Sequence, residues 1–150
     1  MPLETKRLRF FRYFFTAAAD WLAEQLYHRG RMQRHNQYVH GSGIAAGLRL
    51  QPTNPPSLQV RVPPGLAIDP DGEELWVDVE QVVDLSPLVP SAGTRTVYVA
   101  LEHTEQETDP VFVEQLQRQE NTRVTERTVI VTLTQPPGSP RIEVGRVTLG

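Results

Sequence analysis

Two periodicities of apolar residues divide the chain into a helical part and a β part. Between residues 17 and 38, apolar side chains recur every three or four positions without an intervening proline, which predicts a helix. From Ile44 onward, apolar and polar residues alternate in short runs separated by glycine and proline, which predicts strands. The predicted fold is mainly β with an N-terminal helix (α+β), a long helix followed by a small antiparallel β-sandwich or open barrel.

The predicted helix has only a narrow apolar side. Thr16 is its predicted N-cap, because the hydroxyl can accept a hydrogen bond from a backbone N–H of the first turn. Gly41 and Gly43 are the predicted stop signals. A helix of about 22 residues is roughly 33 Å long, and one with so few apolar residues usually needs a partner surface. The residues at helical spacing are Trp21, Leu22, Gln25, Leu26, Arg29 and Met32.

The β part is predicted to contain seven or eight short strands. Residues 69–72, Asp-Pro-Asp-Gly, form a predicted turn, because proline fixes one central φ and glycine accepts a positive φ. Residues 104–121 are mostly polar, and the sequence predicts an irregular loop with a helical turn there. The predicted strands span residues 44–50, 58–62, 66–68, 75–79, 82–85, 96–103, 122–134 and 141–149.

The first fifteen residues mix basic and aromatic side chains and are predicted to form an extended arm. Residues 10–15 alone hold five aromatic side chains, which are poorly accommodated in water. Two interpretations remain open. The arm either covers the end of the chain's own core or anchors the chain in a neighbouring subunit, where aromatic residues and arginine are enriched. We therefore divide the chain into an arm (1–15), a helix with a glycine exit (16–43) and a β-domain (44–150).

Composition narrows the classes of function. The 150 residues include no cysteine, which excludes disulfide scaffolds, thiol catalysis and cysteine-ligated metal sites. No run approaches the roughly 20 apolar residues that span a bilayer, and the basic start lacks the pattern of a signal peptide. We therefore expect no membrane insertion and a cytoplasmic location.

Charge is distributed unevenly along the chain. Residues 1–50 hold eight basic and three acidic residues, whereas residues 51–150 hold seven and fifteen. The two halves could attract each other or partners of opposite charge. All basic residues except Lys6 are arginine, which favours bidentate and stacked contacts at interfaces. Nucleic acid is not an expected partner, because the basic cluster is short and the helix also carries Asp20 and Glu24.

Four short motifs could carry chemistry, and each has a simpler explanation. His28 and His35 lie seven positions apart but lack further ligands at metal-binding spacing. Ser42 follows no predicted strand, so it does not fit a nucleophile elbow. Residues 69–74 lack the full spacing of a calcium loop, and the acidic run at 102–109 is typical of a solvated surface. We therefore expect no enzyme, cofactor or metal site.

Two stretches of the first half carry a resemblance to a known family. One is residues 15–28 (FTAAADWLAEQLYH), which leads through His35 and Asn36 to residues 40–50 (HGSGIAAGLRL). The other is residues 60–75 (VRVPPGLAIDPDGEEL). In order and spacing they resemble the opening of baseplate-associated proteins of phage tails and phage-tail-like contractile injection systems. The Gly-Gln pair that often precedes the helix in that family is absent here.

The resemblance implies a structural subunit of a contractile phage-tail-like particle, at its baseplate. Its partners would be other subunits of the particle, with self-association as a further expectation, and it would dock through the arm and the helix. The interaction residues expected on this basis are Phe10, Phe11, Arg12, Tyr13, Phe14, Trp21, Leu22, Gln25, Tyr27 and His28.

Two other functions remain open. A small ligand- or carbohydrate-binding β-module would use Trp76, Tyr98 and residues 102–109, although the strand position of Trp76 favours the core. A hydrolase would use His40 and Ser42.

Overall fold

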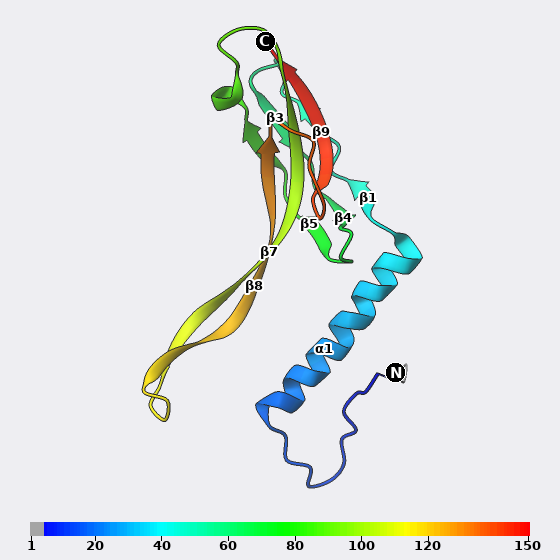
Figure 1. Ribbon diagram of the computed structural model, residues 1–150, viewed down its shortest axis with the longest axis vertical. Coiled ribbons are helices and arrows are strands. Elements are labelled where there is room, and N and C mark those ends of the chain that lie inside the picture. Colours follow the sequence, from blue (N-terminus) through cyan, green and yellow to red (C-terminus); the bar gives the residue numbers. More distant parts are fainter. Residues whose placement is uncertain (1–4) are drawn as a thin grey trace.

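The structure, a computed structural model, describes residues 5–150, so the first four residues of the predicted arm lie outside it. One long helix precedes a series of antiparallel strands, which confirms the prediction of a mainly β chain with an N-terminal helix (Figure 1). The elements are α1 (Ala18–His35), the π-helical turn η1 (Asn36–His40), β1 (Gly43–Gly47), β2 (Gln51–Pro52), β3 (Gln59–Val62), β4 (Gly65–Ile68), β5 (Glu74–Val77), β6 (Gln81–Asp84), the 3₁₀ turn η2 (Ser86–Leu88), β7 (Arg95–Val113), β8 (Arg118–Leu133) and β9 (Ile142–Leu149).

The strands form three antiparallel sheets around one core. The sheet orders are β1-β4-β5, β2-β3-β6 and β8-β7-β9. All three sheets lie at one end of the molecule, from which α1 and the lower half of the β7–β8 hairpin extend (Figure 1). The core takes side chains from every sheet, among them Val60, Val62, Leu75, Val77, Val97, Val99, Leu101 and Val144.

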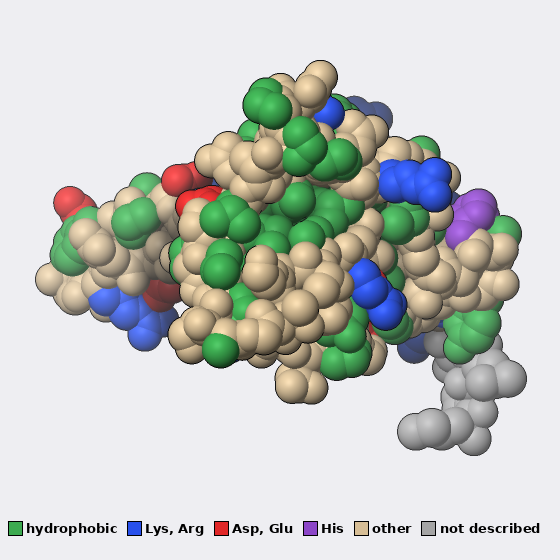
Figure 2. Space-filling view, turned by 90° about the horizontal axis from the view of Figure 1, so that it is seen from above, with side chains coloured by type: hydrophobic (Ala, Val, Ile, Leu, Met, Phe, Trp, Pro, Cys, Tyr) green, Lys and Arg blue, Asp and Glu red, His purple; other side chains and the backbone are tan. Residues whose placement is uncertain are grey.

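The end of the molecule that carries the sheets is not uniformly polar. Figure 2 looks down on this end and shows hydrophobic side chains gathered at the centre, with Lys and Arg side chains set apart from one another. Among the described residues, no helix is both long and apolar enough to cross a membrane.

The helix boundaries differ from those expected. Thr16 is not the N-cap: Ala17 holds that position, and its N–H donates to the Asp20 carboxylate at 2.8 Å. The Thr16 hydroxyl instead accepts a hydrogen bond from the Trp21 indole at 3.1 Å. The α-helical turns end at His35, and residues 36–40 form a π turn, where sequence periodicity predicted continued α-helix.

Residues 104–121 are not a loop, and here the sequence-based prediction was wrong. β7 and β8 continue through this segment as a two-stranded ribbon whose register pairs Glu105 with Glu126 and Val113 with Arg118. Only residues 114–117 form the turn. In a two-stranded ribbon, each strand pairs its backbone hydrogen-bonding groups with the other strand along one edge. This pairing does not require either face of the ribbon to be buried, so a polar sequence can form it.

The prediction for residues 44–50 was only partly right. One strand was expected, but β1 ends at Gly47, and both Gly47 and Leu48 have a φ of 62°. A Cβ on Gly47 would lie 2.0 Å from the Pro64 carbonyl oxygen, so glycine is required where these two segments approach each other. The chain turns there and places Leu48 in the core with no exposed surface.

The hairpin of β4 and β5 follows the expected pattern at its turn. The N–H of Gly72 donates to the Asp69 carbonyl at 3.0 Å, and Gly72 has a φ of 84°. The Asp69 side chain accepts two further backbone N–H groups, which stabilises the turn. Trp76 on β5, expected in the core, is instead 67% exposed, because Leu75 and Val77 take the inward positions on either side of it.

Candidate subunit interface

Helix α1 and the lower half of the β7–β8 hairpin extend from the sheets in nearly the same direction (Figure 1). A cleft lies between them. We call residues 102–127, the part of the hairpin beyond the buried segment 97–101, the outer hairpin. The cleft has a volume of about 950 Å³. Its lining residues are Trp21, Glu24, Gln25, His28 and Arg29 from α1, and Glu107, Asn121, Thr122, Arg123, Val124 and Glu126 from the outer hairpin.

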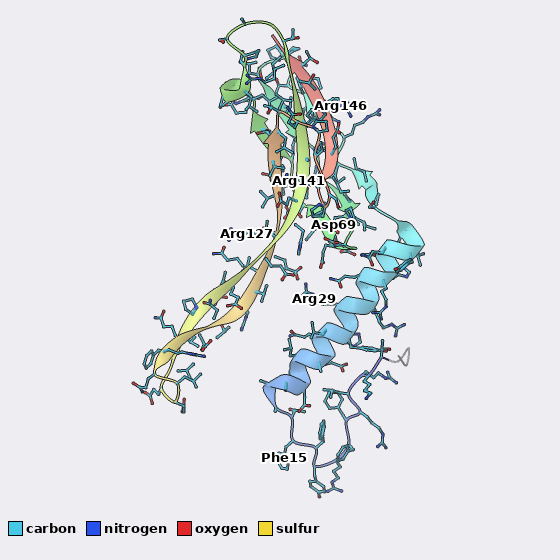
Figure 3. All side chains as sticks on the ribbon, in the orientation of Figure 1. Phe15, Arg29, Asp69, Arg127, Arg141 and Arg146 are labelled. Atoms are coloured by element: carbon cyan, nitrogen blue, oxygen red, sulfur yellow. The ribbon has the colours of Figure 1, made fainter. Side chains whose placement is uncertain are left out.

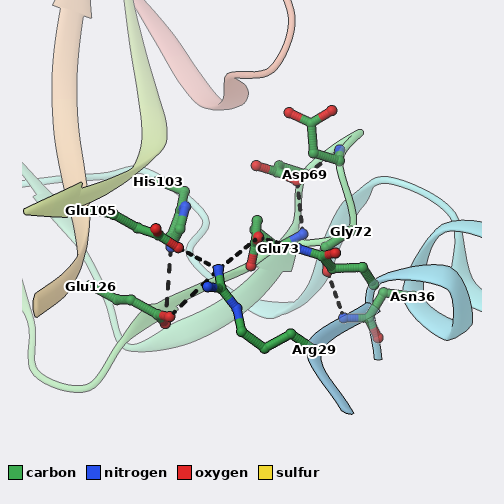
Figure 4. A network of polar contacts seen from close by, with 10 residues as sticks. Arg29, Asn36, Asp69, Gly72, Glu73, His103, Glu105 and Glu126 are labelled. Atoms are coloured by element: carbon green, nitrogen blue, oxygen red, sulfur yellow. Dashed lines mark hydrogen bonds and ion pairs between the residues drawn. The ribbon is translucent and has the colours of Figure 1, made fainter. Parts of the chain in front are cut away.

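Arg29 on α1 joins the two walls of the cleft (Figures 3 and 4). Its guanidinium donates a hydrogen bond to Glu105 on β7, and its Nη2 lies 3.7 Å from Glu73 and 3.9 Å from Glu126. The hydrogen bond to Glu105 raises the pKa of Arg29 above its ordinary value, and the neighbouring carboxylates add to that effect. Three carboxylates therefore share one cation.

His103 lies beside the same carboxylates. Its Nε2 is buried without a hydrogen-bond partner and is 4.0 Å from a Glu126 oxygen. Donor atoms of Glu73, His103 and Glu105 lie within 4.8 Å of one another, a spacing that a metal ion could bridge. The Arg29 guanidinium already supplies a positive charge among these carboxylates, so the cluster is an ion-pair network in this structure (Figure 4).

The C-terminal end of α1 is held by the β4–β5 turn. The Asn36 amide donates to the carbonyl of Gly72 at 2.8 Å, and Asn36 is only 4% exposed. Gln33 donates to Glu73 and Gln37 to the Pro70 carbonyl. Asn36 is the first residue of η1, and α1 itself has no buried residue. The helix is thus fixed at one end, and its N-terminal half projects beyond the sheets.

The arm folds back along the N-terminal half of α1. The backbone N–H of Leu8 donates to Glu24 at 3.2 Å, and the Phe10 and Trp21 rings lie 6.2 Å apart. Phe10 also contacts Phe14, so the structure brings three of the predicted interaction residues together. Phe15 points away from the helix and is 91% exposed (Figure 3). The arm therefore leaves much of its aromatic surface in water.

Of the remaining predicted interaction residues, Phe11 adjoins this cluster. Phe11 stacks on Phe14, and the Arg12 guanidinium covers the Tyr13 ring. Tyr27 is half-buried and makes an edge contact with His28. The side chains that are exposed are Phe10, Phe11, Arg12, Tyr13, Trp21, Leu22, Gln25 and His28, with Phe14 and Tyr27 intermediate.

The sequence analysis did not identify the outer hairpin as part of this surface. Its tip exposes Val111, Phe112 and Leu116, which are 48%, 58% and 54% accessible. Valine and threonine recur between residues 104 and 134, and this β-propensity is the signal that would have predicted long strands. The partners of Arg29 had no such signal, because Glu105 lies 76 positions away in the chain.

Acidification is expected to release the arm from α1. Hydrogen bonds from His28 and from the N–H of Leu8 lower the pKa of Glu24 below its ordinary value of 4.5. Because the folded pKa is the lower one, these bonds stabilise the attached arm above pH 4.5 and are lost as the pH falls through the folded pKa. In a Trp76→Phe variant, Trp21 fluorescence should therefore change between about pH 5 and 3.

Glutamine at position 24 provides the control for this titration. A variant with both Trp76→Phe and Glu24→Gln keeps a hydrogen-bond acceptor but has no carboxyl group to protonate, so its fluorescence should stay nearly constant over the same range. An equal change in both variants would contradict the assignment to Glu24.

The fold consists of a β-domain from which an unburied helix and a hairpin project, with the cleft between these two elements. No protein-family model matches the chain, and no curated protein does. Two solved structures contain chains of similar fold. In the TssK–TssF–TssG baseplate subcomplex of the type VI secretion system, determined by cryo-electron microscopy, the similar chain has a TM-score of 0.53 and 11% identity. In the baseplate complex from the type VI secretion system the values are 0.50 and 13%.

The likeness covers nearly all of this chain. The aligned region is 95% of this chain and 56% of its neighbour in the first structure, and 96% and 54% in the second. The chain thus spans about half the length of each neighbour. At these identities the comparison establishes a shared fold.

Proposed function

We propose that this chain is a non-catalytic structural subunit of a contractile phage-tail-like particle, most simply a baseplate component, that docks to neighbouring subunits through its arm and α1. The observation that carries the proposal is α1 itself, an 18-residue helix with no buried residue. Helices in water draw most of their stability from packing of an apolar face. The chains of similar fold in type VI secretion baseplates support the same role.

The exposed side chains on the arm and α1 are of the kinds that interfaces use. Phe11, Trp21 and Leu22 are each more than half exposed. Arg12, which follows Phe11 in the sequence, is also exposed. Aromatic residues and arginine are enriched at buried interface centres and carry a large share of binding energy. In this proposal the chain is organised as an arm, a helix and a β-domain. Its partners are protein subunits, and the assembly is cytoplasmic.

Incorporation into particles tests the proposal. Particles purified from cells that express the tagged chain are analysed by mass spectrometry, and the chain is expected among the stoichiometric components. A double variant, Trp21→Ala with Leu22→Ala, should reduce incorporation by at least about tenfold, because central interface aromatics cost about 2 kcal/mol or more when truncated. Absence of the unmodified chain from intact particles would overturn the proposal.

Trp76→Ala is the matched control, since it removes another exposed tryptophan from the β-domain. Incorporation of this variant should equal that of the unmodified chain. Circular dichroism of each variant checks that folding is retained.

A ligand-binding β-module remains the second candidate, because Trp76 is exposed beside a cleft of about 680 Å³. That cleft is also lined by Asp78 and Arg127. Tyr98 lies elsewhere, under the Arg146 guanidinium, so the expected group does not gather in one site. Glycan binding that Trp76→Ala abolishes and Trp21→Ala leaves unchanged would favour this function over the first.

A further inference from the structure

The cleft between α1 and the outer hairpin has more negative than positive charge. Its lining includes Glu24, Glu107 and Glu126 against Arg29 and Arg123. Glu73 and Glu105 adjoin it at Arg29, whose positive charge they share. The whole outer hairpin carries seven acidic and three basic residues. A ligand that complements this cleft is therefore cationic.

Apolar side chains lie among these charges. Trp21 on α1 and Val124 on the outer hairpin both line the cleft, and each is 55% exposed. Trp21 presents a ring on which a phenyl group or a guanidinium can stack. The chemistry of the cleft thus fits a peptide that combines arginine with aromatic residues.

The arm has this composition. Residues 5–15 include four basic side chains, no acidic one, and five aromatic rings. Among the described residues, none of these cations takes part in an ion pair, and no residue of the arm lines the cleft of its own chain. The arm's own attachments, Leu8 to Glu24 and Phe10 to Trp21, keep it along its own helix.

We propose that the cleft between α1 and the outer hairpin is the receptor for the arm of a second copy of this chain. Arginines of the incoming arm face Glu107 and Glu126, and its aromatic rings cover Trp21 and Val124. Each copy gives its arm to one neighbour and receives the arm of another, a head-to-tail contact that closes into a ring if the rotation permits. The inference rests on the proposed assembly role, for which it supplies one specific contact.

Charge exchange in the 150-residue chain tests the contact. Sedimentation velocity is expected to show concentration-dependent association that weakens between about 50 mM and 500 mM salt, because exposed ion pairs are screened. Arg9→Glu with Arg12→Glu on the arm, or Glu107→Lys with Asn121→Lys on the outer hairpin, should each raise the dissociation constant at least about tenfold. The four changes together should restore much of the affinity.

Two control variants change charge equally at exposed positions outside the arm and the cleft. Arg49→Glu with Arg95→Glu matches the arm variant, and Asp78→Lys with Gln81→Lys matches the hairpin variant. Both should associate like the unmodified chain.

Three outcomes would overturn the proposed contact. The unmodified chain could remain monomeric at low salt, the arm and hairpin variants could associate normally, or the combined variant could fail to regain affinity although it is folded by circular dichroism. In each case the chain could still be incorporated into particles, so failure of this contact is distinguishable from failure of the proposed function.

Discussion

Replacing Leu101 with alanine is expected to lower the free energy of unfolding by about 2–5 kcal/mol, the usual range for a leucine truncated in a packed core. Leu101 has no exposed surface and lies where β7 pairs with both Ile130 on β8 and Ile142 on β9. The next residue, Glu102, begins the outer hairpin. The substitution therefore leaves a cavity at the base from which the hairpin projects. Urea unfolding followed by circular dichroism measures the loss.

Leu116→Ala is the matched control for this substitution. Leu116 lies in the turn at the tip of the same hairpin and is 54% exposed. Surface truncations usually change stability by less than about 0.5 kcal/mol, so this variant should unfold with nearly the same midpoint as the unmodified chain. Similar losses of stability for the two variants would contradict the assignment of residues 97–101 to the core.

Much of the sheet architecture could be predicted because its strands face a core. In β7 the large apolar residues Val97, Val99 and Leu101 occupy every second position and are all fully buried. The turn at residues 69–72 was also predictable, because proline and glycine determine its backbone locally. Both features depend on short-range rules that a single sequence expresses directly.

The segment 104–121 of the outer hairpin could not be identified as strand from alternation of apolar residues, because it has no core face to bury. Its polar residues and the Asp109-Pro110 pair predicted a loop, yet each strand satisfies the backbone of the other. Asp109 takes a φ of 58° within the ribbon, a conformation that aspartate accepts more readily than most residues. A segment stabilised mainly by backbone pairing leaves little trace in hydrophobic periodicity.

The candidate interface was predictable on one wall only. Trp21, Gln25 and His28 were expected to contact partners, and all three are exposed and line the cleft. The opposite wall depends on contacts such as Arg29 with Glu105, which are far apart in sequence. Trp76 shows the same limit, since alternation within β5 does not reveal which of its faces meets the core.

Replacing Gly72 with alanine is expected to detach the C-terminal end of α1 from the β4–β5 turn. Gly72 has a φ of 84°, and a Cβ at this position would lie 2.4 Å from the carbonyl oxygen of Gln33. That oxygen belongs to the helix backbone, so the helix or the turn has to move. The move also breaks the hydrogen bond from Asn36 to the Gly72 carbonyl, which leaves a buried amide without its partner.

The expected loss of stability for Gly72→Ala is about 2–4 kcal/mol, the sum of left-handed backbone strain and the lost buried hydrogen bond. Hydrogen exchange followed by mass spectrometry should also show faster exchange in residues 30–40, because the contact between the β4–β5 turn and the end of the helix is lost. Asn36→Ala should produce the same change in exchange without any change in backbone strain.

Gly93→Ala separates the strain from the contact. Gly93 has a similar φ of 73°, but a Cβ there meets nothing within 4 Å. The free energy of unfolding of this variant should therefore fall only by the cost of a left-handed alanine, about 1–2 kcal/mol. Hydrogen exchange in α1 should be unchanged. Suppose that Gly72→Ala and Gly93→Ala lost equal stability and that α1 exchanged normally in both. The contact between the β4–β5 turn and the C-terminal end of α1 would then not be what orients the helix. The cleft between α1 and the outer hairpin would then depend on Arg29 and its carboxylates alone, since these are the other contacts that join α1 to the strands.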